Sequence, residues 1–398
     1  MKTTSKLERS HQLDFFRGIL LILITIDHAL AYNNIIKRFT YEFFGWVSGA
    51  EGFVFLSGLT AGLIYTYKFL EKGNAFVLDT SFRRVQKIYT NHILLLLFAF
   101  AMVLAFTFFV SSDWMTRYWM STYPFFFAEP AKAIVLGLLL LYQPTYLDIL
   151  PMYAVFILFV PFLVKSLQKK AMWLVLLVSF LLYVVGSASS FYPFLDNIIQ
   201  SPLLKMRYFN LLCWQFLFVI GLVSGFLFYH GKTKEWQRNK YLFGLAICVS
   251  VLFFGLKNAH VEIAGINLEY LTDKANLGPL RLLNFLALCY TLTFIASKKG
   301  NWFASRPICY LGRNSLEVFT LHIALIIVFM PILYYLNKES SIDVYNEFKF
   351  YPLETALVFF VIIPALFLAP FLLNEKYRVA LINRSLRAIE PEKIREVA

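Results

Sequence analysis

Charged residues are scarce in this sequence. Asp, Glu, Lys and Arg make up 15% of its 398 residues, whereas hydrophobic residues make up 59%. Soluble domains carry about 25% charged and about 45–50% apolar residues. The shortage of charge therefore excludes a soluble globular domain and indicates an integral membrane protein with several spans.

Cysteine is also scarce, which excludes a disulfide framework. The four cysteines lie in apolar runs and lack disulfide or metal-ligand spacing, so we expect no metal site; they are Cys213, Cys248, Cys289 and Cys309. A cleavable signal peptide is not expected either, because the apolar run around Ile19 is too long and no small-residue cleavage site follows it.

The net charge of +13 has an explanation other than nucleic acid. Lys and Arg gather in the cytoplasmic loops of membrane proteins. The expected partner is therefore the lipid bilayer, and we predict no nucleic-acid partner.

Apolar runs give the candidate spans, each of which needs about 20 residues. They lie near 14–32, 46–67, 89–111, 131–142, 149–164, 171–187, 211–229, 241–256, 281–297, 314–336 and 354–373. The basic loops all face the cytoplasm only if 131–142 does not cross. That segment is also short, since about 12 helical residues reach about 18 Å, against a hydrocarbon core of about 30 Å. The prediction is an all-α, polytopic membrane helix bundle of about ten crossings, with a re-entrant segment near 131–147 and both termini cytoplasmic. Residues 1–398 are expected to form a single domain.

The first span carries ionisable side chains in "LDFFRGILLILITIDHAL", residues 13–30. Arg17 and His28 are eleven positions apart, which places them within about 20° on one helix face and about 16 Å apart along the axis. Intramembrane ionisable residues are costly and usually mark functional sites, and histidine is suited to proton transfer near neutral pH. A snorkelling role for Arg17 and structural roles for Asp14 and Asp27 remain open.

The second span contributes a carboxylate near the expected level of His28. Glu51 stands in "GWVSGAEGFVFLSGLTAG", where it could hold an imidazole in one tautomer. Gly58 and Gly62 in the same stretch form a GxxxG pair, which indicates close helix packing.

Basic residues cluster at the inner ends of two later spans. "RRVQKIYTNH" contains Arg83, Arg84 and Lys87, which suit either a topology signal or the phosphates of a cytoplasmic ligand. "LGRNSLEVFTLHIAL" places Arg313 at the inner boundary and His322 in mid-membrane, where a core role and a functional role stay equally open.

Polar residues on the expected outer side form a weak carbohydrate-binding pattern. Asp148 lies in "QPTYLDILPMY", and "NLLCWQ" supplies Asn210, Trp214 and Gln215. Such groups, when they converge on a cavity, fix the orientation of a substrate. Nearby Trp, Tyr and Phe residues suit either sugar stacking or an aromatic belt at the membrane surface.

The motifs quoted above, together with "AEGFVFLSG" and "NLLCWQFLF", resemble the OpgC family, membrane proteins that succinylate osmoregulated periplasmic glucans. They also resemble the wider transmembrane acyltransferase superfamily, which shares the spacing between Arg17 and His28. The resemblance implies an enzyme of the bacterial inner membrane with no permanently bound cofactor. Its donor would be cytoplasmic acyl-CoA, best guessed as succinyl-CoA and otherwise acetyl-CoA, and its acceptor a hydroxyl of a periplasmic glucan or another glycan.

This resemblance gives each candidate residue an expected role. The catalytic group comprises His28 as general base with Asp27 and Glu51 orienting it. The acyl-CoA-binding group comprises Arg17, Arg83, Arg84, Lys87 and Arg313. The acceptor-binding or oxyanion-stabilising group comprises Ser57, Asp148, Asn210, Trp214, Gln215 and His322.

Three alternatives stay open at this stage. One is an acetyltransferase of a surface polysaccharide. Another is a proton-coupled transporter or flippase, against which stands the absence of a visible inverted repeat. The third is a non-catalytic subunit for polysaccharide export or assembly. The sequence does not separate direct transfer from an acyl-histidine intermediate. It also leaves open whether the protein forms a homo-oligomer.

Overall fold

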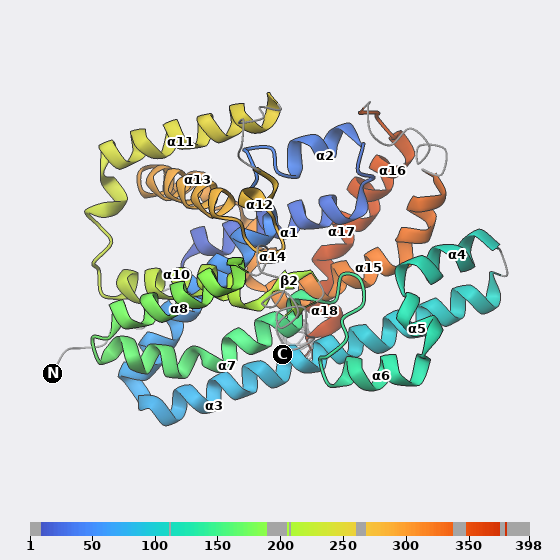
Figure 1. Ribbon diagram of the computed structural model, residues 1–398, viewed down its shortest axis with the longest axis horizontal. Coiled ribbons are helices and arrows are strands. Elements are labelled where there is room, and N and C mark those ends of the chain that lie inside the picture. The colour runs from blue at the N-terminus through green and yellow to red at the C-terminus, as the bar shows by residue number, and fades with distance from the viewer. Residues whose placement is uncertain are drawn as a thin grey trace, which may run out of the picture.

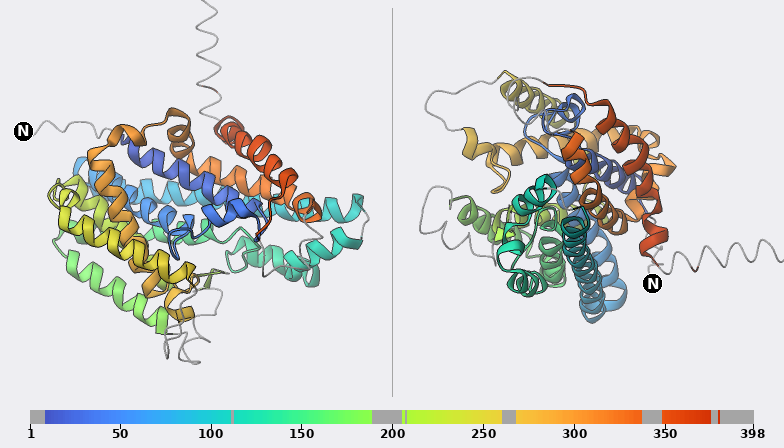
Figure 2. Two further views of the ribbon diagram at one scale, coloured as in Figure 1. Left: turned by 90° about the horizontal axis from the view of Figure 1, so that it is seen from above. Right: turned by 90° about the vertical axis from the view of Figure 1, so that its right-hand side faces the viewer.

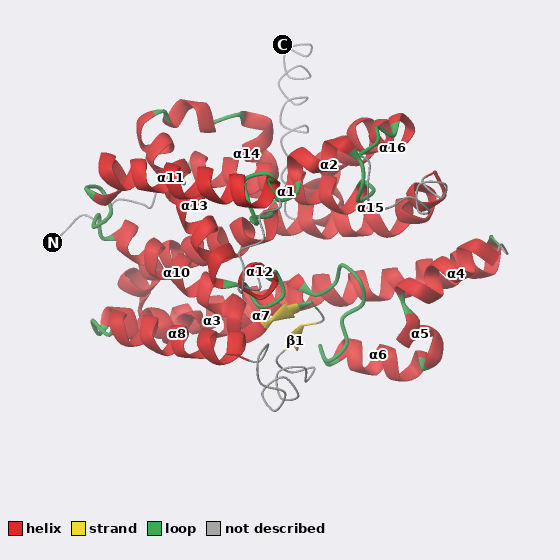
Figure 3. Cartoon of the chain, turned by 45° about the horizontal axis from the view of Figure 1, so that its top comes forward, coloured by secondary structure: helices red, strands yellow, loops and turns green. Residues whose placement is uncertain are grey.

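The computed structural model describes residues 9–110, 113–188, 205–206, 208–259, 268–336, 348–374 and 379. Helices account for nearly all regular structure in these ranges, as predicted (Figures 1 and 3). The long helices are α1 (His11–Ala29), α3 (Gly49–Phe109), α7 (Ile149–Gln168), α8 (Met172–Ala188), α10 (Leu211–Tyr229), α11 (Lys240–Asn258), α13 (Pro279–Lys298) and α15 (Ser315–Leu336).

Shorter elements connect these helices. They are α2 (Ile35–Thr40), α4 (Asp113–Thr122), α5 (Pro124–Ala128), α6 (Pro130–Leu138), α12 (Leu268–Thr272), α14 (Arg306–Arg313), and α16 (Pro352–Leu357) to α18 (Ala369–Leu373). Strands β1 (Lys205–Met206) and β2 (Phe209–Asn210) pair antiparallel.

Seven helices of the described ranges are long and apolar enough to span a membrane. They are α3, α7, α10, α11, α13, α15 and the helical stretch Pro352–Leu373. Together they make this a membrane protein. The predicted number of about ten crossings, the cytoplasmic termini and the re-entrant segment stay predictions. The structure forms only the short helix α6 within 131–147.

Helix α3 is two helices joined at Gly73. This glycine has φ +78° and ψ 177°, a conformation that residues with a Cβ rarely adopt. The chain turns sharply there, so that the first arm runs beside α10 and the second arm beside α7 (Figure 1). The second arm and α4 project beyond the rest of the bundle at one end (Figure 2). The two arms correspond to the two predicted spans 46–67 and 89–111.

Close helix packing at the GxxxG pair is confirmed. A Cβ on Gly58 or Gly62 would collide with the backbone of α10, at Phe218 and Leu222 respectively. Gly221 and Gly225 of α10 face the α3 backbone in the same way. Small residues thus allow two backbones to touch where lipid supplies no hydrophobic drive for helix association.

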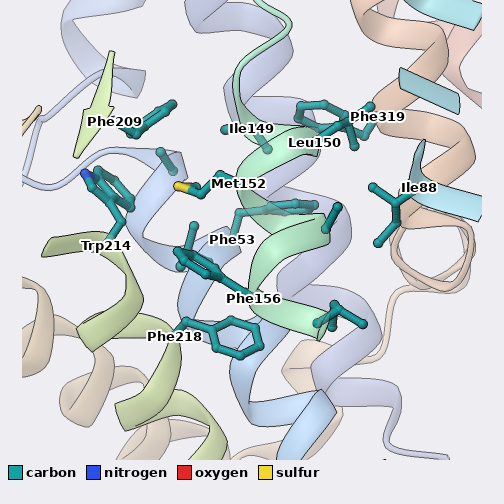
Figure 4. Packing of buried hydrophobic residues seen from close by; sticks show 14 of the residues in the cluster. Phe53, Ile88, Ile149, Leu150, Met152, Phe156, Phe209, Trp214, Phe218 and Phe319 are labelled. Atoms are coloured by element: carbon teal, nitrogen blue, oxygen red, sulfur yellow. The ribbon is translucent and has the colours of Figure 1, made fainter. Parts of the chain in front are cut away.

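The core lies where both arms of α3 meet α7, α10 and α15. Its side chains include Phe53, Met152, Phe156, Phe218 and Phe319 (Figure 4). Helix α1 packs against this core through α3 and α15, and α14 covers its other side. Helix α1, predicted as the charged first span but not among the seven apolar helices, is therefore enclosed by protein along much of its length.

Candidate functional site

Two histidines from distant parts of the chain meet inside the bundle. His28 occupies the last turn of α1, and His322 lies in α15. The distance between His28 Nδ1 and His322 Nε2 is 3.4 Å, and the ring planes are inclined by 22°. Tyr146 lies on another side of His28, with the ring centroids 5.0 Å apart. Tyr146 belongs to the motif "QPTYLDILPMY", and the sequence alone predicted no role for it.

The hydrogen bonds of His322 define its tautomer. His322 Nδ1 lies 2.7 Å from the backbone oxygen of Phe319, and a carbonyl oxygen can only accept. The proton of a neutral His322 is therefore on Nδ1, which leaves Nε2 as an acceptor. His28 must then donate from Nδ1. His28 Nε2, which makes no hydrogen bond with the described residues, keeps its lone pair.

Asp27, which was expected to help orient His28, has another partner. Its carboxylate accepts a hydrogen bond of 2.7 Å from Thr40 Oγ1. It therefore ties the end of α1 to α2. Asp27 precedes His28 in the sequence, but the imidazole of His28 contacts His322 and not Asp27.

Glu51 is engaged in a buried ion pair. Its Oε1 accepts from Arg281 Nη1 at 2.7 Å, while Oε2 accepts from the backbone and side chain of Ser48 at 2.9 and 2.7 Å. Glu51 is 0% exposed and Arg281 is 3% exposed. Both oxygens are thus committed to holding the start of α3 against α13, and we no longer assign Glu51 to His28.

Arg281 extends this pair into a network that sequence reasoning missed. Its Nη2 donates to Glu42 at 2.6 Å, and Glu42 also accepts from Lys257 at 3.0 Å. Burial raises the pKa of Glu42, but the charges of Arg281 and Lys257 outweigh it and hold that pKa below its ordinary value. The cation Arg281 at the start of the predicted span 281–297 was the available signal.

Two arginines stand near a cavity between α3, α7 and α15. Arg84 lines it together with Ser57, Tyr153, Ser315 and Phe319, among others. Arg17 acts electrostatically on Arg84 and Tyr153 and is therefore close by. Its Nη2 donates to the oxygen of Leu56 at 3.4 Å, while its buried Nε has no hydrogen-bond partner.

These two arginines differ from the other predicted donor-binding cations in having no carboxylate partner among the described residues. Arg83 pairs with Asp79 at 3.0 Å, and Lys87 pairs with Glu317. Arg313 shares Asp14 with Arg9, at 3.2 and 2.7 Å. The structure therefore leaves Arg17 and Arg84 without a carboxylate partner and assigns the remaining three to ion pairs. Tyr153, which sequence reasoning also left without a role, joins the cavity.

Phe319 connects the cavity with the histidine pair. Its ring contacts His322 with a centroid distance of 4.7 Å, and it stacks on Phe53 at 5.7 Å on the other side. The cavity, Phe319, His322 and His28 thus follow one another through the bundle.

Of the predicted acceptor residues, His322 contacts His28, whereas Asn210, Trp214 and Gln215 have other partners. Asn210 caps α10 and donates to Asn276 and to the oxygen of Gly186. Gln215 exchanges hydrogen bonds with Ser179. Trp214 is fully buried and donates to the backbone oxygens of Lys274 and Ala275 at 3.2 and 3.1 Å. We revise these three to structural positions, because their polar groups are already occupied. Asp148 lies buried at the start of α7.

A family model described as OpgC protein matches residues 9–360. The chain belongs to the OpgC family. The matched region contains both histidines, both unpaired arginines and the cavity. No curated protein and no solved structure matches the chain. OpgC membership implies a transferase and suggests a membrane acyltransferase-type function.

Proposed function

We propose that this OpgC-family protein is a membrane-embedded O-acyltransferase with His28 as its general base. The acyl group, best assigned as succinyl, comes from cytoplasmic acyl-CoA, and the acceptor is a hydroxyl of a periplasmic glucan. The observation that carries the proposal is the contact of His28 Nδ1 with His322 Nε2, because it leaves the lone pair of His28 Nε2 for a substrate proton.

The reaction needs one proton acceptor and no Ser or Cys nucleophile. His28 Nε2 takes the proton from the sugar hydroxyl as the oxygen attacks the thioester carbon. The new C–O bond forms, the C–S bond breaks, and the departing CoA sulfur receives the proton from His28. His322 Nε2 accepts from Nδ1–H of the transient imidazolium and stabilises it. General-base catalysis of this kind contributes about 10²–10⁴-fold.

Arg17 and Arg84 supply the donor-binding charge in this proposal. Neither has a carboxylate partner among the described residues, and they meet close to the cavity. Guanidinium groups bind phosphates and carboxylates with paired hydrogen bonds, so the CoA phosphates or an acyl carboxylate suit this place. Ser57 and Tyr153 line the small cavity beside Arg84, and a pantetheine arm would have to displace side chains between this cavity and His28.

The decisive experiment uses purified His28→Ala with His230→Ala as a matched control. His230 lies at the end of α10, away from the site. Acyl transfer from succinyl-CoA and from acetyl-CoA to glucan is measured for folded protein. We expect His28→Ala to lose at least about 10²-fold in turnover and His230→Ala to retain it. Near wild-type turnover in folded His28→Ala would refute the proposal.

Reconstituted vesicles separate acyl transfer from transport. An acyltransferase releases CoA and acylates glucan on the opposite side of the membrane. Movement of substrate without CoA release would favour the transporter alternative.

A further inference from the structure

Two lysines from different parts of the chain flank one aromatic ring near His28. Lys274 Nζ lies 4.9 Å from the centroid of the Tyr41 ring, and Lys37 Nζ lies 5.9 Å from it. Both lysines are close enough to act electrostatically on His28 and on Asp27. Lys37 also donates to the oxygen of Leu30, two residues after His28, so the cluster of two cations and a tyrosine lies at the end of α1 that carries His28.

Lys274 is the cation of this cluster that remains available. Lys37 Nζ already donates to the backbone oxygen of Leu30 at 3.1 Å. Lys274 Nζ has no carboxylate within 4.0 Å in the described ranges. Its neighbour Asp273 makes no ion pair with it, and that carboxylate accepts instead from the backbone of Ala275 and Asn276 at 3.2 and 2.7 Å.

Buried side chains hold the backbone around Lys274 in place. Trp214 Nε1 donates to the oxygens of Lys274 and Ala275, and Arg281 Nε donates to the oxygen of Thr272 at 2.9 Å. Tyr183 donates to the oxygen of Leu277 at 3.0 Å. The segment following α12 is therefore fixed on both sides of Lys274, while its ammonium group is left unpaired. Preorganised charge of this kind is characteristic of ligand sites.

We infer that Lys274, supported by Lys37 and Tyr41, binds an anionic group that a substrate brings next to His28. This inference rests on the proposed function and names the chemistry of the substrate. The group is a carboxylate or a phosphate, since both accept charge-assisted hydrogen bonds from an ammonium. It comes either from the far end of a dicarboxylic acyl chain or from an anionic substituent on the acceptor glycan.

The two sources are separated with four substrate combinations. The donors are succinyl-CoA and butyryl-CoA, whose acyl chains have equal length and of which only the succinyl chain carries a carboxylate. The acceptors are a neutral glucan and the same glucan carrying phosphate esters. Wild-type protein is compared with Lys274→Gln, with Lys274→Arg, and with Lys232→Gln as a control at an exposed lysine.

We expect kcat/KM of Lys274→Gln to fall by about 10-fold to 10²-fold for the charged member of a pair, which matches the loss of one charged hydrogen bond. Lys274→Arg should restore much of the loss, and Lys232→Gln should change nothing. A loss confined to succinyl-CoA assigns the site to the acyl carboxylate. A loss confined to the phosphorylated glucan assigns it to the acceptor.

A uniform loss with all four combinations, or no loss with any, would overturn the inference. Failure of the proposed function is recognised separately, since wild-type protein would then transfer no acyl group in any combination.

Discussion

His322 accepts a hydrogen bond from His28 at 3.4 Å while its own Nδ1–H is held by the Phe319 carbonyl. The pair resembles the arrangement in which a carboxylate orients a catalytic histidine, but here the orienting group is a neutral ring. His322 is therefore a positioning residue for His28 in the proposed reaction.

His322→Phe removes this acceptor and retains ring volume. We expect kcat to fall by about 10²-fold with little change in KM, and the acid limb of the pH–rate profile to shift. His322→Gln, whose amide oxygen can accept from His28, should recover part of the rate. If His322→Phe lowers only the yield of folded protein and leaves turnover and pH profile unchanged, the residue has a packing role alone.

Arg84 and Arg83 provide a matched pair for the donor site. Arg84 lines the cavity, whereas Arg83 is exposed and paired with Asp79. Arg84→Ala and Arg17→Ala should each raise the KM for acyl-CoA by about 10-fold, the effect of losing one charged hydrogen bond of about 1.5 kcal/mol. Arg83→Ala should change it less than about 2-fold, since exposed pairs contribute about 0–1 kcal/mol. Equal effects at positions 83 and 84 would remove Arg84 from the donor site.

The Glu51–Arg281 pair is expected to govern stability. Arg281→Met leaves Glu51 as a buried charge without its cation, which typically costs about 3–5 kcal/mol. Glu51→Gln should cost less, because Arg281 keeps its ion pair with Glu42. The double variant should recover much of that loss, as measured by unfolding in detergent. Turnover of the folded Glu51→Gln fraction should stay close to wild type. A selective loss of kcat at unchanged stability would return Glu51 to the catalytic group.

Glu42 gives the ion network of Glu51, Arg281 and Lys257 a sensitivity to acid. Its pKa is lowered on folding, because Arg281 and Lys257 outweigh the effect of burial. A carboxylate of this kind contributes stability above its unfolded pKa, about 4.3, and loses that contribution as the pH falls through the lower folded value. Thermal unfolding from pH 7 down to pH 3 should show a smaller acid-dependent loss in Glu42→Gln than in wild type. Glu129→Gln, which removes the exposed partner of Lys132, should follow wild type. Identical acid profiles for Glu42→Gln and wild type would exclude this role.

Helix positions could be predicted because the hydrophobic runs alone decide them. The predicted span 211–229 coincides with α10, and 149–164 falls within α7. The sequence predicted two separate spans for α3. It did not predict that helix continues between them, interrupted only at Gly73. The GxxxG contact followed from residue size at fixed spacing.

The site was predicted only where one helix carried the information. Arg17 and His28 share a face of α1, and the sequence gives that spacing directly. The partners of Glu51, Trp214 and Asn210 lie some 60 to 230 positions away in the chain. The sequence around each residue therefore could not show that its polar group forms a structural hydrogen bond. For the same reason His322 remained undecided until its contact with His28 was known.

The bend at Gly73 has a mechanical consequence for the cavity. Ser57 and Arg84 both line it, yet they belong to opposite arms of α3. The angle between the two arms therefore sets the distance between the two sides of the cavity, one carrying Ser57 and the other Arg84. One glycine at position 73 thus helps to set the width of the cavity between Ser57 and Arg84.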